Sequence, residues 1–173
     1  AENRRNERRD DIFDILESNG FKINDVVDYT SAEEEELFLE GTGSILIDRV
    51  NKKAYCALSE RADEELFIEF CEDFDFFPVI FTANQSVDGK RLPIYHTNVM
   101  MALAENFVII CADSIDDKKE KKNVLDHLKK DGKEIISYEI GEPISSTPAI
   151  VGTKIIVGCE DGNVYAFETK GKK

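Results

Sequence analysis

The sequence predicts an α/β protein in which one ββαβ unit occurs twice and a small all-β segment follows. Residues 38–83 and 94–140 each contain two apolar strands, a helix and a closing strand in the same order. Residues 141–173 alternate short β-rich runs with turns that contain Gly. The 173 residues are 42% hydrophobic and include 11 Phe, enough for a packed core, so the composition excludes simple disorder.

The chain starts with half of a third unit. Apolar side chains at Ile12, Ile15 and Leu16 share one helical side, which predicts a helix over residues 3–19 that ends at an Asn-Gly pair. A strand is predicted over residues 23–29. The hairpin that opens the other units is absent here. We therefore expect the chain to begin inside a larger architecture.

In the first complete unit, residues 45–47 and 54–58 predict a hairpin, and residues 78–82 predict the closing strand. Ser59 stands where a helix N-cap would lie. The helix that follows repeats apolar residues on one face, as a helix that covers a sheet does. That face consists of Leu66, Phe67, Phe70, Cys71 and Phe74.

The second unit repeats the pattern. Residues 99–103 and 107–111 predict the hairpin, Ser114 the N-cap, and residues 134–140 the closing strand. Its helix carries Val124, Leu125 and Leu128 on the apolar face and His127 on the polar side, and it ends at an Asp-Gly pair. Met100 and Met101 are expected in the core.

The composition changes near residues 140–142, which predicts two domains, residues 1–140 and 141–173. The whole net charge of −14 belongs to the first. This charge opposes nucleic acids and anionic membranes and attracts cations such as guanidinium compounds. No apolar run approaches the ~20 residues of a membrane span, and no signal peptide is evident, so we expect a cytoplasmic protein.

The four cysteines are widely separated, without a CxxC pair or a nearby His at metal-ligand spacing. We therefore predict buried free thiols, no metal site and no cofactor. The acidic run at residues 33–36 is expected to be a solvated surface.

The repeat places Glu40 and His96 at equivalent points, each at the head of its unit. Units arranged about one axis would bring the two side chains together, where a carboxylate could bind a cation and an imidazole could move protons. The alternative is that Glu40 is only a turn residue before Gly-Thr-Gly and His96 a structural histidine. The spacing alone leaves both interpretations open.

Residues 3–140 resemble the arginine-deiminase-related, amidinotransferase-like branch of the pentein family of guanidine-modifying proteins. Four motifs carry the resemblance: NRRNERR at residues 3–9, FLEGTGSILIDR at 38–49, AYCALSER at 54–61 and YHTNVMM at 95–101. It implies a five-unit α/β propeller, of which this chain would hold an incomplete part.

The same resemblance implies that Glu40 grips a substrate guanidinium and that His96 is the general acid and base. Asn98 stands where many arginine deiminases have a second guanidinium-binding Asp. The nucleophilic Cys of the family lies in its last module, and no segment of this sequence matches that module. Residues 141–169 resemble one PQQ-like β-propeller repeat.

Two functions follow as expectations. The first is a fragment or chimera of a guanidine-group hydrolase that binds an arginine-like molecule and is inactive alone, unless a partner supplies the thiol. The second is a non-catalytic binding or scaffold protein. Because an incomplete propeller leaves strand edges unpaired, we expect a second copy or a complementary chain to cover them.

Overall fold

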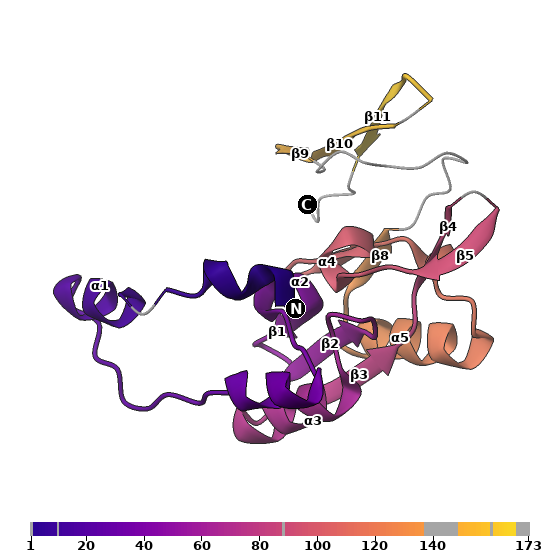
Figure 1. Ribbon diagram of the computed structural model, residues 1–173. Helices are drawn as coiled ribbons and strands as arrows, with labels where there is room; N and C mark the ends of the chain where they lie inside the picture. Colours follow the sequence, from indigo (N-terminus) through magenta and orange to yellow (C-terminus); the bar gives the residue numbers. More distant parts are fainter. Residues whose placement is uncertain (1, 10, 88, 137–148, 160, 169–173) are drawn as a thin grey trace. The chain divides into compact units, whose positions relative to one another are not determined.

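A computed structural model describes residues 2–9, 11–87, 89–136, 149–159 and 161–168 (Figure 1). The chain divides into two compact regions, residues 1–137 and 138–173, and each is described by itself. Both ββαβ units lie in the first region. The boundary predicted near residues 140–142 lies outside the described residues. Within the described part of the chain, no helix has both the length and the apolar character that crossing a membrane requires.

The α/β prediction is confirmed, and each copy of the unit opens with one helical turn that the sequence did not reveal. The first copy contains α2 (Gly41–Ser44), β1 (Ile45–Asp48), β2 (Lys53–Ala57), α3 (Glu64–Asp73) and β3 (Phe77–Phe81). The second contains α4 (Thr97–Met100), β6 (Met101–Leu103), β7 (Phe107–Ile110), the 3-10 turn η3 (Ala112–Ser114), α5 (Lys118–Lys130) and β8 (Glu134–Ile136). The turn α4 takes the place of the strand start predicted at residue 99.

Both ββαβ units have the same sheet topology. Strand β1 runs antiparallel to β2 and β2 parallel to β3, while β6 runs antiparallel to β7 and β7 parallel to β8. A parallel pair needs a crossover connection, and α3 and α5 supply it. The registers correspond, because Ile45 pairs with Cys56 at the start of β1 and Met101 pairs with Ile110 at the start of β6.

Aspartates, not the predicted serines, cap the two long helices. Asp63 accepts a hydrogen bond from the backbone N–H of Leu66 at 3.1 Å, and Asp117 accepts from two first-turn amides of α5 at 2.7 and 2.9 Å. A carboxylate satisfies the free amides and also interacts favourably with the positive end of the helix dipole. Ser59 and Ser114 lie before the helices, so both N-cap predictions are wrong.

The two ββαβ units share one hydrophobic core. Tyr55 and Val79 of the first unit pack in the same buried cluster as Val108 and Val124 of the second. Met100 and Met101 are buried there, as predicted. A second cluster lies under α3 and includes Phe67, Cys71 and Ala54. The shared core fixes the heads of the two units relative to each other.

The N-terminal segment differs from its prediction. It forms the 3-10 helix η1 (Glu2–Glu7), the short helix α1 (Ile12–Ser18) and the 3-10 helix η2 (Thr30–Glu35). Residues 23–29 form no strand, and Ile12 in α1 is 41% exposed. A helix of this length is marginal without a packed face, which explains why residues 3–19 do not form one continuous helix.

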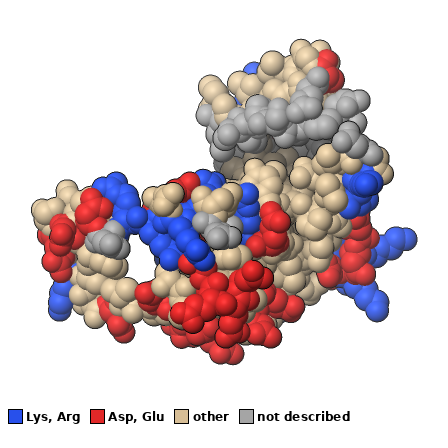
Figure 2. Space-filling model, in the orientation of Figure 1, with Lys and Arg blue, Asp and Glu red and all other residues tan. Residues whose placement is uncertain are grey.

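Acidic side chains gather over η2 and α3, with basic residues of the N-terminal segment beside them (Figure 2). Glu33 is less solvated than predicted, because its side chain is only 12% exposed. It forms ion pairs with Arg5 at 3.0 Å and Arg8 at 2.9 Å. The pair with Arg5 attaches η1 to η2, and the pair with Arg8 attaches the residue that follows η1.

Two further groups of strands complete the described fold. The hairpin of β4 (Asn84–Val87) and β5 (Lys90–Pro93) joins the two ββαβ units. In residues 138–173, strands β9 (Ala149–Val151), β10 (Lys154–Gly158) and β11 (Val164–Glu168) form one antiparallel sheet in the order β11-β10-β9. Among the described residues of this segment, the predicted short β-rich runs are thus confirmed.

His127 is half-buried, more than its predicted place on the polar side of the helix implied. Its ring lies 5.2 Å from that of Phe77, centroid to centroid, and within the described residues its buried Nδ1 has no hydrogen-bond partner. Burial, with the positive charge of Lys53, lowers the pKa of His127 below its usual 6.5.

This lowered pKa predicts a pH dependence of stability. The unfolded chain binds the His127 proton more tightly, so the contribution is complete above pH 6.5 and is lost as the pH falls through the lowered pKa. We expect thermal melts at about pH 7.5 and about pH 5.5 to differ more in the wild type than in His127→Leu. Equal differences in both proteins would contradict this assignment.

Candidate functional site

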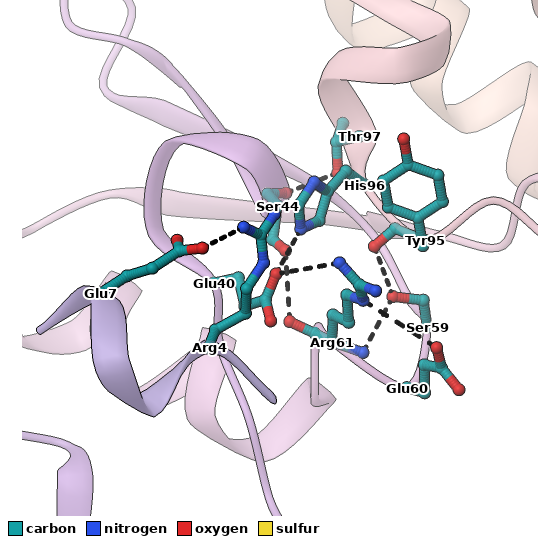
Figure 3. Close-up of polar contacts among 10 residues, drawn as sticks. All are labelled: Arg4, Glu7, Glu40, Ser44, Ser59, Glu60, Arg61, Tyr95, His96 and Thr97. Carbon is teal, nitrogen blue, oxygen red and sulfur yellow. Dashed lines mark hydrogen bonds and ion pairs between the residues drawn. The ribbon is translucent and has the colours of Figure 1, made fainter. Parts of the chain in front are cut away.

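The structure brings Glu40 and His96 together at the heads of the two units (Figure 3). Glu40 immediately precedes α2, and His96 immediately precedes α4. His96 Nε2 lies 2.6 Å from Glu40 Oε2, and each side chain is 13% exposed. The repeat therefore places a carboxylate and an imidazole in direct hydrogen-bond contact at a partly accessible point.

The charge of Glu40 decides where the His96 proton lies. Burial would raise the pKa of Glu40, but hydrogen-bonded and charged neighbours, among them His96 and Arg61, outweigh it and hold this pKa below its usual value. Glu40 is therefore ionised near neutral pH and can only accept hydrogen bonds. It follows that His96 Nε2 carries a proton, and that Nδ1 is the basic nitrogen whenever the imidazole is neutral.

Gly43, in the middle of α2, lets the His96 ring approach the backbone. A Cβ at this position would lie 2.7 Å from Nδ1 and 2.8 Å from Cε1 of His96, closer than real Cβ contacts. The second Gly of the Gly-Thr-Gly sequence is thus required by the imidazole.

Arg61 and Tyr95 complete the surroundings of the pair and were missed in the sequence analysis. Arg61 Nη1 lies 3.6 Å from Glu40 Oε2, and its guanidinium carbon lies 5.1 Å from the centroid of the Tyr95 ring. The rings of Tyr95 and His96 are 4.9 Å apart, centroid to centroid. The sequence did contain a pointer to both residues, because Arg61 ends the AYCALSER motif and Tyr95 opens the YHTNVMM motif. A carboxylate beside an aromatic face is a suitable environment for a guanidinium group.

Asn98 is exposed on α4 and is not among the described hydrogen-bond partners of Glu40 or His96. Its role as a second guanidinium ligand stays a prediction. Of the thiols, Cys56 and Cys71 are buried as predicted, whereas Cys111 is exposed because it follows the end of β7. Within the described residues, no group of three His, Cys, Asp or Glu side chains could hold a metal ion.

Comparison with protein families gives a match over most of the chain. The model of eukaryotic N,N-dimethylarginine dimethylhydrolase matches residues 1–143, which include Glu40, Gly43, Arg61 and His96. The chain belongs to the dimethylarginine dimethylhydrolase family. Searches among curated proteins and among solved structures find no match.

Membership in the dimethylarginine dimethylhydrolase family confirms the predicted resemblance to guanidine-modifying pentein proteins. It covers both ββαβ units and the N-terminal segment, and the described strands β9, β10 and β11 lie beyond its last matched residue. The PQQ-like repeat at residues 141–169 and the arrangement of the units in a propeller stay predictions.

Proposed function

We propose that this chain binds the guanidinium group of an N-methylated arginine at Glu40 and His96 and provides the acid–base chemistry of guanidino-group hydrolysis. The observation that carries the proposal is the position of the Glu40 carboxylate, whose Oε2 lies 2.6 Å from the His96 imidazole and 3.6 Å from the Arg61 guanidinium. Arg61 supports the substrate class, because this carboxylate already interacts with a guanidinium group.

The proposed chemistry follows from the two nitrogens of His96. Glu40 accepts from Nε2 and stabilises the imidazolium, so protons are exchanged at Nδ1. When an attacking thiolate adds to the guanidinium carbon, protonated His96 donates its Nδ1 proton to the departing amine. Neutral His96 then takes a proton from the water that attacks the same carbon, which releases the thiol and a ureido product.

The thiol is proposed to come from outside this chain. Burial raises the pKa of Cys56 to about 12 and that of Cys71 to about 11, so neither forms a thiolate readily. Cys111 is exposed, but it lies between β7 and the turn that leads to α5, and not at the head of a ββαβ unit, where Glu40 and His96 lie. We therefore propose that the chain alone binds the guanidinium compound and does not hydrolyse it, as a fragment or chimera would.

Calorimetric titration with asymmetric N,N-dimethylarginine, together with an assay for dimethylamine and ureido product, tests this proposal. We expect saturable binding to the wild type, at least tenfold weaker binding to Glu40→Gln, and no product. Citrulline, which lacks the positive charge, is the control ligand and is expected not to bind. Absence of binding by the wild type would contradict the site, and product formation that disappears in Cys111→Ala would contradict the external thiol.

A non-catalytic scaffold is the second candidate function. The observation that favours it is that β1 and β3, like β6 and β8, each have only one strand partner in the described sheets. Strand edges of this kind can pair with another chain. Sedimentation measurements over a range of concentrations test it, since a scaffold of this kind is expected to self-associate and a protein that stays monomeric throughout would not be one.

A further inference from the structure

Thr97, the residue after His96, is a fully buried polar side chain with two hydrogen bonds. Its Oγ1 donates to the backbone carbonyl of Ser44 at 2.5 Å and accepts from the backbone N–H of Ala57 at 2.8 Å. Ser44 is the last residue of α2, and Ala57 is the last residue of β2. One hydroxyl thus joins the first turn of the second unit to two elements of the first.

The bond from Thr97 to Ser44 is drawn beside the Glu40 and His96 pair in Figure 3. Thr97 is covalently next to His96, and Ser44 closes the turn that Glu40 precedes. Both ends of that turn also bind Arg61. The backbone carbonyl of Arg61 accepts hydrogen bonds from Glu40 N at 3.1 Å and from Ser44 Oγ at 3.2 Å. The Thr97 hydroxyl therefore links the end of α2 directly to the start of α4.

We propose that Thr97 is a positioning residue, whose hydroxyl sets the distance between α2 and α4 and so maintains the hydrogen bond from His96 to Glu40. A valine has nearly the same shape and would fill the same space, so packing alone does not require a hydroxyl here. This positioning role would serve the proposed function, and in that respect the proposal rests on it. The hydrogen bond that it concerns exists in the ligand-free protein and can be measured there.

The experiment is a nitrogen-15 NMR measurement of the imidazole N–H groups in the ligand-free chain. The chain has only two histidines, so His127 provides an internal reference in each spectrum. A hydrogen bond between an imidazole N–H and a carboxylate slows exchange of that proton with solvent. In Thr97→Val we expect the His96 Nε2 proton to exchange at least tenfold faster than in the wild type, and in Thr97→Ser we expect the wild-type rate.

Loss of stability alone must be separated from loss of positioning. Val124→Ala removes buried atoms from α5 and is the matched control, which we expect to melt at a lower temperature without faster exchange at His96. If Thr97→Val does not fold, Thr97→Ala takes its place in the same comparison. Unchanged exchange in the folded valine or alanine variant would overturn the proposal, as would faster exchange in Val124→Ala of equal size. Absence of ligand binding in the wild type would instead contradict only the proposed function.

Discussion

Replacing Gly43 by Ala is expected to weaken binding of a guanidinium ligand by at least tenfold, because loss of one hydrogen bond to a charged group costs about 1.5 to 3 kcal/mol. The added Cβ would lie 2.7 Å from His96 Nδ1, so the ring must move. A displaced ring cannot keep its 2.6 Å contact with Glu40. Calorimetric titration with asymmetric N,N-dimethylarginine measures the change.

Thr42→Ala is the control for Gly43→Ala, because Thr42 is exposed on the same helical turn. We expect this variant to bind like the wild type. Since Ala favours a helix more than Gly does, the fold of Gly43→Ala is expected to persist, and circular dichroism checks it. Wild-type affinity in a folded Gly43→Ala variant would show that the ring position does not matter for binding.

Replacing Lys133 by Met is expected to lower the free energy of unfolding by about 3 to 5 kcal/mol, the usual effect of breaking a buried ion pair. Lys133 Nζ lies 2.9 Å from Asp48 Oδ2, and both side chains are only 2% exposed. The ammonium also donates to the carbonyls of Ala104 and Glu105 at 2.9 and 2.8 Å. Asp48 belongs to the first ββαβ unit, and Lys133 immediately precedes β8 of the second. The ion pair therefore attaches the two ββαβ units to each other.

The remaining charge of Asp48 explains the size of this effect. Burial would raise the pKa of Asp48, but hydrogen bonds from Asn51 and Lys133 lower it, so in Lys133→Met a buried carboxylate loses its counter-ion. Urea denaturation measures the loss. Lys122→Met is the control, because its ion pair with Asp126 is exposed and is expected to contribute little. A similar small effect in both variants would contradict this account of the interface between the units.

The sequence predicted the repeat, and with it one arrangement in which Glu40 meets His96. Two copies of one apolar pattern imply two copies of one fold, and a position shared by both copies has the same local geometry in each. The hairpins, the long helices and the closing strands follow from the same periodicity. The contact between Glu40 and His96 could be anticipated because the two residues lie at equivalent points of the repeat.

Other features depend on contacts that no local pattern contains. The helical turns α2 and α4 are each four residues long, too short for a periodic signal. Residues 23–29 have strand-like composition but no neighbouring strand with which to pair among the described residues. Arg61 reaches Glu40 from the loop after β2, a contact between distant parts of the chain. The Asp-Gly pair before β5 did indicate a hairpin turn, and the sequence analysis overlooked it.

The central claim is that Glu40 and His96 form one guanidinium-binding site, and an NMR titration of the two imidazoles tests it most directly. As asymmetric N,N-dimethylarginine is added, we expect the His96 resonances to shift to saturation and those of His127 to stay in place. Citrulline is expected to move neither. Saturable binding that leaves His96 unperturbed, or that shifts both histidines alike, would contradict the claim.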